Sequence, residues 1–573
     1  MGGSVKQEQD VAIYIAGKAD LNISGGEIEG TTGVEIRAGK LNVTGGTITA
    51  TAEEFVATPN GNGSTSIGAA IAVTQHSTNH ELTATISGGT FTGVRALYEE
   101  DTCDDNISGI SMSVNGGIFN GEVYSENVTS FITRGTFHKS IPANYTANNS
   151  MVAVSGSNDA KIYEVIDLSN GYTMTGDIEI ATPITINTAG SINFNLGTYS
   201  LTNKTAYDYD ACGKTECYVF EVQSGTLNIS GSGSVNAIGG SDYDMAVFAN
   251  GSGKVNISGG KFTNEGKENA GCDLIYVRDQ AEVAITGGEF EAGNLSDDVG
   301  YQYVALNLRD ADRSTASISV TGGKFYKFNP ANNVSEGALT NFTANNTMVA
   351  VSGSNDAKIY EVIDLSNGYT MTSDIEIATP ITINTAGSIN FNLGTYSLTN
   401  KTAYDYDACG ETECYVFEVQ SGTLSISGNG SVNAIGGSDY DMAVFANGSG
   451  KVNISGGKFI NEGKENAGCD LIYVRDQAAV AIAGGEFEAG NLSADVGNQY
   501  VALNLRDADR STASISVTGG KFYKFNPANN VSEGANTNFV AEGYSSYIDG
   551  DYYKVSATSE GTTVTEALSV VNW

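Results

Sequence analysis

The sequence predicts an all-β fold, namely a right-handed parallel β-helix (a β-solenoid) built from tandem modules that each end in a small β-hairpin segment. Three observations support this prediction. The chain contains a long internal repeat, each copy contains a shorter repeat marked by paired glycines, and no long stretch shows helical periodicity. A short unit that cannot bury its apolar face alone becomes stable when its neighbours stack on it, which is the principle of a solenoid.

The long repeat begins at Met151, which pairs with Met348, and continues at an offset of 197 residues until Ala338 pairs with Ala535. A stalk gains length and a binder gains avidity from each copy, whereas a catalytic domain seldom gains from repetition. The positions that differ between the copies are Gly176/Ser373, Lys214/Glu411, Asn228/Ser425, Ser232/Asn429, Thr263/Ile460, Glu282/Ala479, Thr286/Ala483, Asp297/Ala494 and Tyr301/Asn498. The predicted segments are 1–165 (a module truncated at its amino terminus), 166–362 and 363–555 (the copies), and 556–573 (a tail or the start of a next module).

The shorter repeat places an apolar strand before and after a Gly-Gly pair, as in Ile257-Ser-Gly-Gly-Lys-Phe262 and Ile285-Thr-Gly-Gly-Glu-Phe290. Alternating apolar residues turn one side of each strand inward, and glycine supplies the positive φ angles that a sharp corner needs. We therefore expect equivalent residues to stack in the core. The predicted ladders are Ile229, Ile257, Ile285 and Val320 in one, and Phe262, Phe290 and Phe325 in the other.

The composition is strongly acidic, with 66 Asp and Glu against 29 Lys and Arg and a formal net charge of −37. Nucleic acids and anionic membrane surfaces attract basic residues, so this charge argues against both as partners. The hydrophobic share of 40% excludes wholesale disorder, and we find no apolar run long enough for a transmembrane helix. The start, Met1-Gly-Gly-Ser-Val-Lys-Gln7, lacks the apolar segment of a secretory signal, and we interpret it as an added start on a fragment.

Each module ends in a similar way. In the third ending, a Gly-Gly-Lys-Phe coil at 519–522 is followed by Asn538-Phe-Val-Ala-Glu-Gly-Tyr544 and by a hairpin around Asp549-Gly-Asp-Tyr-Tyr553. This ending resembles the repeated β-helix modules of large surface proteins of gut Gram-positive bacteria, and of virion proteins of gut phages, including crAss-like ones. The resemblance covers nearly the whole chain. It implies a pectin-lyase-like β-helix displayed outside a cell or on a particle, and it implies no chemistry.

Charged residues gather at the ends of the predicted strands. Arg278-Asp279 and Arg309-Asp310 are about one coil apart, so we expect them on neighbouring rungs. Paired carboxylates suit a glycosidase and an Asp cluster beside Arg suits a Ca²⁺-assisted polysaccharide lyase, but a charge ladder is the favoured interpretation, so no catalytic residue is assigned. The candidate ligand-binding residues are Asp242, Tyr243, Asp244, Arg278, Asp279, Arg309 and Asp310 in the first copy, and Asp439, Tyr440, Asp441, Arg475, Asp476, Arg506 and Asp507 in the second.

Candidates for a metal ion or a disulfide come from clustered acidic residues and from closely spaced cysteines. Carboxylate oxygens suit Ca²⁺, and no other cofactor is predicted. The candidates for a structural Ca²⁺ are Asp208, Asp210, Asp297 and Asp298. A disulfide outside the cell and two reduced thiols are equally compatible with the cysteine spacing in one surface loop of each copy. The candidate disulfides are Cys212–Cys217 and Cys409–Cys414.

From these observations we predict a non-enzymatic, extracellular β-solenoid of a bacterial surface protein that acts as a stalk and adhesion module. Tyrosines beside acidic residues, such as Tyr243, can stack on sugar rings, so a glycan or a host surface receptor is the predicted partner. A phage fibre or capsid-decoration protein is the alternative. A polysaccharide lyase or glycoside hydrolase is the second alternative. We predict no binding to nucleic acid and no insertion into a membrane.

Overall fold

A computed structural model of the chain provides the structure of the protein. It divides into two compact units: unit 1 comprises Met1–Ser319 and Asn333–Thr340, and unit 2 comprises Val320–Asn332 and Asn341–Trp573. The four segments inferred from the repeat remain a prediction. The structure describes residues 3–58, 60, 63–101, 109–207, 215–240, 243–265, 273–293, 305–336, 338–354, 357–403, 413–436, 440–462, 470–490, 502–533 and 535–558.

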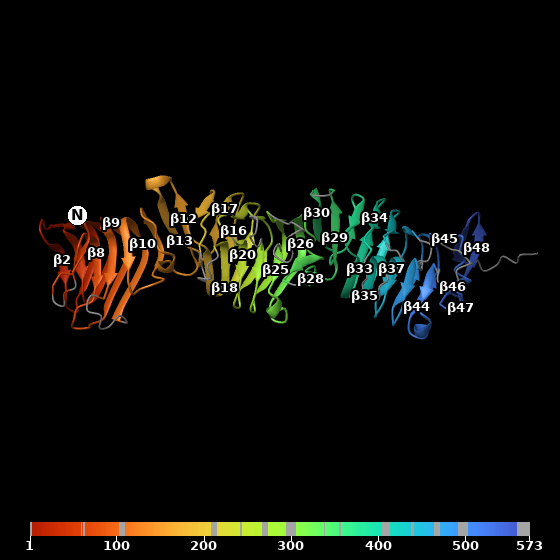
Figure 1. Cartoon of the computed structure of the whole chain (residues 1–573). Coiled ribbons are helices and arrows are strands. Elements are labelled where there is room, and N and C mark those ends of the chain that lie inside the picture. Colours follow the sequence, from red (N-terminus) through yellow and green to blue (C-terminus); the bar gives the residue numbers. More distant parts are fainter. Residues whose placement is uncertain are drawn as a thin grey trace, which may run out of the picture. The chain divides into compact units, whose positions relative to one another are not determined.

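Both units are all-β. Their described residues form strands and short 3-10 turns and contain no α-helix (Figure 1). Consequently, no helix in the described part of the chain is long and apolar enough to cross a bilayer. Many strands alternate between buried and more exposed residues, as β19 (Ser234–Ala237) and β21 (Lys254–Ile257) do. This alternation is typical of a strand with one face toward a core.

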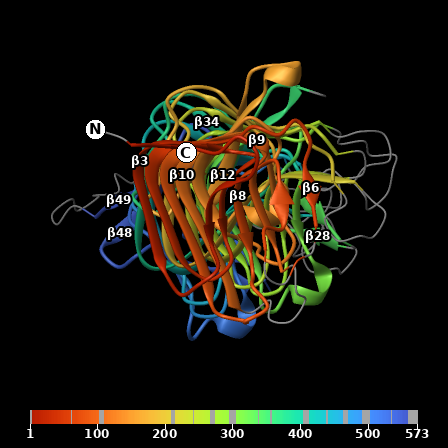
Figure 2. The same cartoon turned by 90° about the vertical axis from the view of Figure 1, so that its left-hand side faces the viewer.

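The amino-terminal section of unit 1 consists mainly of parallel strands, which Figure 2 shows following one another in nearly the same direction. Each strand pairs with its equivalent in the next repeat. One series contains β1 (Ser4–Lys6), β3 (Asp20–Gly30), β5 (Gly39–Ala50), β9 (Leu82–Glu100), β10 (Ile110–Ser125) and β11 (Ile132–Phe137). Another contains β2 (Val11–Ile15), β4 (Thr32–Ile36), β8 (Ala69–Thr74) and part of β9, and β6 (Val56–Ala57) and β7 (Ser66–Ile67) form a small hairpin.

Three series of parallel strands run through the next part of unit 1, an arrangement compatible with a β-solenoid. The first contains β16 (Ile184–Asn195), β18 (Glu216–Ser230), β20 (Tyr243–Ala249), β23 (Ile275–Val277) and β25 (Leu306–Leu308). The second leads from the end of β18 through β21 to β24 (Glu282–Glu291). The third contains β15 (Ile178–Ile180), β17 (Ser200–Asn203), β19, β22 (Lys261–Asn264) and the end of β24.

Unit 2 repeats these three series. The first contains β33 (Ile381–Asn392), β35 (Glu413–Ser427), β37 (Tyr440–Ala446), β40 (Ile472–Val474) and β43 (Leu503–Leu505). The second leads from the end of β35 through β38 (Lys451–Ile454) and β41 (Ala479–Ile482) to β44 (Ser514–Val517). The third contains β32 (Ile375–Ile377), β34 (Ser397–Asn400), β36 (Ser431–Ala434), β39 (Lys458–Asn461), β42 (Glu486–Glu488) and β45 (Lys521–Tyr523).

Antiparallel hairpins follow the parallel series. In unit 1 this hairpin is formed by β12 (Ser150–Ser155) and β13 (Ile162–Asp167). In unit 2 two hairpins of the same kind are formed by β29 (Thr347–Ser352) with β30 (Ile359–Asp364), and by β48 (Tyr544–Asp549) with β49 (Tyr552–Ala557). Unit 1 also contains the short hairpin of β27 (Asn333–Ser335) and β28 (Ala338–Thr340).

The core ladders have the register that the sequence predicts. In unit 1, Ile257 pairs with Ile229 and Ile285, and Phe262 pairs with Phe290. The two phenylalanine rings stack with centroids 5.1 Å apart. Unit 2 contains both ladders in full: Ile426, Ile454, Ile482 and Val517 in one, and Phe459, Phe487 and Phe522 in the other. Val320 and Phe325 are assigned to unit 2, whereas Ile285 and Phe290 are assigned to unit 1.

The paired glycines allow the chain to turn close to the preceding repeat. Gly288 has a φ of +101°, a conformation that residues with a Cβ rarely adopt. Its neighbour Gly287 is restricted by space instead, because a Cβ there would lie 2.6 Å from the carbonyl oxygen of Ser258. The two glycines of the pair are therefore required for different reasons.

Replacing Ile257 with alanine should lower the free energy of unfolding by about 2–5 kcal/mol, because its side chain is fully buried and the substitution leaves a cavity. The control is Lys254→Ala on the same strand, which removes a half-exposed ion pair to Glu282 and should cost less than about 1 kcal/mol. Denaturant unfolding of the full chain measures both values. Equal costs would contradict the buried position of Ile257.

Candidate functional site

Two strand ends bring the predicted charged residues together in unit 1. β23 and β25 pair in parallel, with Val277 opposite Leu308. Arg278 and Arg309 directly follow these strands, and the Arg309 amide donates a hydrogen bond to the Val277 carbonyl at 3.0 Å. The neighbouring rungs expected from the sequence spacing are therefore present.

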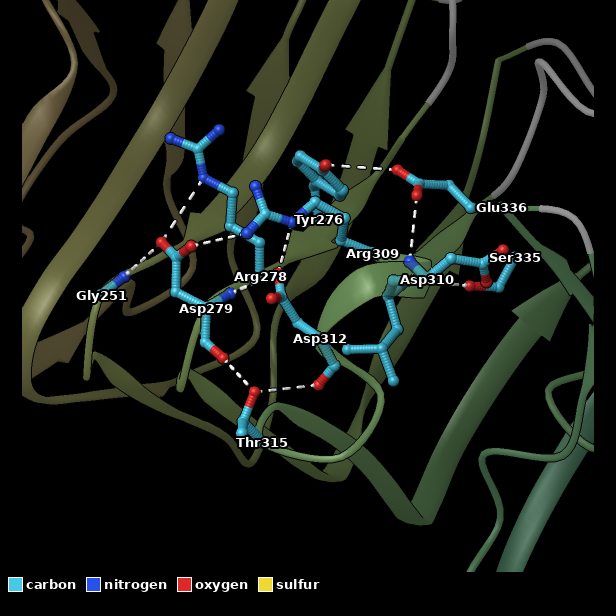
Figure 3. A network of polar contacts seen from close by, with 11 residues as sticks. Gly251, Tyr276, Arg278, Asp279, Arg309, Asp310, Asp312, Thr315, Ser335 and Glu336 are labelled. Carbon is cyan, nitrogen blue, oxygen red and sulfur yellow. Dashed lines mark hydrogen bonds and ion pairs between the residues drawn. The ribbon is translucent and has the colours of Figure 1, made fainter.

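Arg309 lies at the centre of a network of polar contacts (Figure 3). Its Nη2 donates to Oδ1 of Asp279 at 2.8 Å, and its Nε donates to Oδ2 of Asp312, at the end of the 3-10 turn η5 (Asp310–Asp312). The Asp279 amide donates to the same Oδ2 of Asp312 at 2.7 Å. The hydrogen bond from Arg309 and the one from this amide lower the pKa of Asp312 below its usual value. The Asp312 carboxylate is therefore held in the ionised form beside the Arg309 guanidinium.

Asp279 has an unusual backbone, because its φ is +64° in the left-handed region. Its surroundings hold it in this conformation. The Gly251 amide donates to its Oδ2 at 3.0 Å, and the Thr315 hydroxyl donates to its carbonyl at 2.6 Å (Figure 3). The left-handed turn directs this carboxylate toward both Arg278 and Arg309.

Arg278 is the arginine of the network that is bound least tightly by its neighbours. Among the described residues, its guanidinium makes one ion pair, from Nε to Asp279 at 3.7 Å, which is too long for a hydrogen bond. The guanidinium lies 4.8 Å from the ring centroid of Phe248, and that ring stacks on Tyr276. The Arg278 side chain is 38% exposed. A guanidinium that is partly exposed and lies on an aromatic surface is suited to contact with an external ligand.

A second part of the network holds the turn that follows Arg309. Arg313 donates to Oδ1 of Asp310 at 2.6 Å and to the Ser335 carbonyl at 2.9 Å. Glu336 accepts a hydrogen bond from the Asp310 amide at 3.0 Å and from the Tyr276 hydroxyl at 3.2 Å. Burial and the negative charge of Glu336 raise the pKa of Tyr276 above its usual value, so the phenol remains protonated.

Asp273 is a buried carboxyl beside this network. Burial raises its pKa to about 7, and the charge of Glu336 acts in the same direction. The side-chain amide of Asn307 donates a hydrogen bond to Asp273 at 3.1 Å, which opposes the rise. Asn307 in turn accepts a hydrogen bond from the Ser335 hydroxyl at 3.3 Å. Such a perturbed carboxyl is a frequent feature of functional sites and also of structural networks.

Unit 2 contains the same arrangement. Arg506 donates to Asp476 at 2.9 Å, the Asp476 amide donates to Asp509 at 2.7 Å, and Arg475 lies 4.8 Å from the ring centroid of Phe445. Asp470 corresponds to Asp273, and burial raises its pKa to about 7 as well. The positions that differ between the two copies include no residue of this network.

Other predicted residues lie elsewhere. Asp244 and Asp441 are 2% and 1% exposed, so these predicted ligand contacts are buried; Asp244 accepts a hydrogen bond from the Gly240 amide at 2.6 Å. Tyr243 packs partly buried against a cluster that includes Phe248. The network includes Asn307, Ser335, Glu336 and Thr315, which sequence analysis missed. Only Asn307 carries a signal, since it alternates with Leu306 and Leu308 and so faces away from the core.

Few of the metal and disulfide candidates lie within the described residues. Asp208, Asp210, Asp242, Asp297, Asp298, Cys212, Cys409 and Asp439 lie outside the described residues, as does the side chain of Tyr440. The described part of the chain contains no group of three His, Cys, Asp or Glu residues arranged to hold a metal ion. Cys217 and Cys414 are buried, and each thiol donates a hydrogen bond to a backbone carbonyl, at 3.3 and 3.4 Å. Burial raises the pKa of Cys217 to about 11, which keeps this thiol protonated.

An open groove of about 840 Å³ lies over the paired glycines of the amino-terminal section of unit 1. Threonine hydroxyls, backbone groups and an ion pair between Arg134 and Asp167 at 3.1 Å give it polar walls. Its lining includes Gly45, Gly46, Gly88, Gly89, Gly116, Gly117, Gly135, Thr47, Thr90 and Thr136.

The chain matches no known protein family, no curated protein and no solved structure.

The variant Asp273→Asn/Asp470→Asn should remove part of the dependence of stability on pH. The pKa of each carboxyl is about 7 in the folded protein and about 4 in the unfolded chain. Because the folded state favours the protonated form, the stability from each group is complete below about pH 4 and is lost as the pH rises to about 7. Thermal unfolding between pH 4 and 8 should show a smaller decline for the variant. Superimposable pH profiles of variant and wild type would contradict the assignment.

Asp279→Ala should be less stable than Asp279→Gly by about 1 kcal/mol. Both substitutions remove the carboxylate from Arg309, so their difference isolates the cost of placing a Cβ at a φ of +64°. Chemical denaturation of the two variants measures this difference. If alanine is tolerated as well as glycine, the left-handed conformation of residue 279 is wrong.

Proposed function

We propose that this chain is a non-enzymatic, right-handed parallel β-helix of a bacterial surface protein, displayed outside the cell as a stalk and adhesion module. The observation that carries the proposal is the repetition of three parallel strand series in unit 1 and in unit 2 with the same register. Repetition of this kind extends a structure and presents the same surface more than once. The resemblance to modules of gut bacterial surface proteins supports display outside a cell, and its extension to gut phages makes a virion protein the second candidate.

The electrostatics of the network support a binding role over a catalytic one. A glycosidase needs one carboxyl that remains protonated as a general acid and a second that is ionised and faces the substrate. Asp279 and Asp312 are instead held by the same guanidinium, and the pKa of Asp312 is lowered. Asp273 has the raised pKa of a general acid, but only 7% of this residue is exposed. Asp279 and Asp312 therefore hold Arg309 in position, and Asp273 is too buried to face a substrate.

The proposed ligand contact is the partly exposed guanidinium of Arg278 together with its counterpart Arg475. Arg475 is 39% exposed and, like Arg278, lies over an aromatic ring. A planar guanidinium donates hydrogen bonds to carboxylate or hydroxyl groups, and a glycan offers both. The partner in this proposal is a glycan or a glycosylated surface receptor. The formal net charge of −37 supports the exclusion of nucleic acid from the set of partners.

The test compares Arg278→Ala, Arg475→Ala and the double variant in the full chain on arrays of bacterial and host glycans. We consider the case in which both copies contact one immobilised ligand. Each single variant should then lose about 10-fold or more in apparent affinity, because the second contact is governed by effective concentration. The double variant should lose binding. Lys254→Ala is the control, since this exposed lysine lies on another strand series. Unchanged binding of the double variant would contradict the ligand contact, and no binding of wild type to any glycan would favour a passive spacer.

A further inference from the structure

The turn after the β12–β13 hairpin of unit 1 contains an exposed asparagine that is followed by a glycine. Ser169-Asn170-Gly171 connects β13 to β14 (Tyr172–Thr173). The Gly171 amide donates a hydrogen bond to the Leu168 carbonyl at 2.8 Å, which closes the turn. Asn170 is exposed, and its side-chain amide makes no hydrogen bond to any described residue. This side chain is therefore free to rotate toward the backbone nitrogen of Gly171.

Unit 2 contains the same turn after the β29–β30 hairpin. Ser366-Asn367-Gly368 precedes β31 (Tyr369–Thr370), and the Gly368 amide donates to the Leu365 carbonyl at 2.8 Å. Asn367 is exposed as well, and within the described part of the chain its side-chain amide is not hydrogen-bonded. A turn at the surface opens locally at low cost. Neither the asparagine nor the glycine of these turns is therefore held firmly.

A second Asn-Gly pair in unit 1 is held by two carboxylates. Asn250 is 8% exposed, and its Nδ2 donates to Oε1 of Glu221 at 3.0 Å. The Gly251 amide donates to Oδ2 of Asp279 at 3.0 Å, which makes this turn part of the Arg309 network (Figure 3). The side chain of Asn250 and the backbone nitrogen that follows it are thus both fixed.

The equivalent pair in unit 2 is fixed in the same way. Asn447 is 7% exposed, its Nδ2 donates to Glu418 at 2.9 Å, and the Gly448 amide donates to Asp476 at 3.0 Å. One dipeptide therefore occurs in two environments, and each environment occurs in both units. We call Asn170 and Asn367 the turn asparagines. Asn250 and Asn447 are the held asparagines.

We propose that the turn asparagines are sites of spontaneous deamidation and that the held asparagines are protected from it. In this reaction the backbone nitrogen of the glycine loses its proton and attacks Cγ of the asparagine. The new C–N bond closes a cyclic imide, and the bond between Cγ and Nδ2 breaks, so that ammonia leaves with the proton. Water then opens the imide at either carbonyl and yields aspartate or isoaspartate. Glycine has no side chain to obstruct the attack.

The hydrogen bonds explain why the two environments differ. At Asn250 the contacts with Glu221 and Asp279 must both break before the ring can close. Burial of this asparagine also limits the access of the water that completes the reaction. At Asn170 only the hydrogen bond of an exposed turn must break. Ring closure should therefore be slower at the held asparagines by about 10-fold or more.

Deamidation changes the charge and the backbone of the turn. It adds a negative charge close to Asp167, whose Oδ1 accepts a hydrogen bond from the Ser169 amide at 2.9 Å. Isoaspartate also lengthens the main chain between Leu168, which is fully buried, and β14. The chain therefore becomes more acidic with age at one turn in each unit. This modification requires no partner, so it is independent of the proposed ligand contact at Arg278.

The experiment incubates the full wild-type chain in a mildly alkaline buffer and measures the conversion of each asparagine by peptide mapping with mass spectrometry. Peptide mapping separates these four sites from the other Asn-Gly pairs of the chain. The turn asparagines should convert about 10-fold or more faster than the held asparagines. In denaturant the four rates should converge, because the local structure is lost. Comparable rates in the folded chain, or no conversion of the turn asparagines, would overturn the proposal.

The variant Asp279→Gly tests the protection of Asn250 separately. It removes the acceptor of the Gly251 amide and remains compatible with the left-handed backbone at residue 279. Conversion of Asn250 should become several-fold faster, whereas Asn447 in the same molecules keeps its contact with Asp476 and is the matched control. Circular dichroism verifies that the β-structure is retained. An unchanged rate at Asn250, or an equal acceleration of Asn447, would contradict protection by Asp279.

Discussion

The rest of the structure depends on parallel stacking in register. Neighbouring strands in a sheet lie about 4.8 Å apart, so each inward residue lies beside its equivalents in adjacent repeats. Ile454, for example, is paired between Ile426 and Ile482. A shift by one residue would turn every inward side chain outward, and a change of volume at one rung would affect its two neighbours. The paired glycines serve this constraint, because they let each turn approach the backbone of the preceding repeat.

The same stacking creates a problem at the strand ends. It places Arg278 beside Arg309, and like charges on adjacent rungs repel. The network resolves this repulsion with the carboxylate of Asp279, which contacts both guanidinium groups because its backbone is left-handed. Asp312 accepts a hydrogen bond from Nε of Arg309, which Asp279 does not contact. The acidic residues of this turn therefore compensate the repulsion between the two stacked arginines.

Much of the fold could be predicted from the sequence because it rests on local patterns repeated at a fixed spacing. The Gly-Gly pairs, the alternation around Ile257 and the 197-residue offset predict parallel strands and their ladders.

The candidate site could be predicted only in part. Spacing predicted that Arg278 and Arg309 lie on neighbouring rungs, but Glu336 reaches the site from a hairpin 60 residues from Tyr276 along the chain. The burial of Asp244 was also missed, because it depends on how turns cover the strands and not on the residue itself.

The two copies show which exposed interactions are dispensable. Lys254 and Glu282 form an ion pair in unit 1, while unit 2 places Ala479 opposite Lys451. In unit 1 the side chains of Asn256 and Asn228 form a hydrogen bond. In unit 2 the position of Asn228 is occupied by Ser425, so this pair of asparagines is not conserved between the copies. Interactions of this kind contribute about 1 kcal/mol or less, so their loss is tolerated.

Arg278 differs from these dispensable groups. It contributes only a long ion pair and a ring contact to the folded structure, yet it is retained as Arg475 with the same ring beneath it. Because the two copies differ at only the nine aligned positions named above, this retention follows from the repeat itself, and what sets Arg278 apart is a side chain nearly two-fifths exposed with one long ion pair. This is why the proposed ligand contact lies at Arg278 and Arg475 and not at the arginines that hold the turn together.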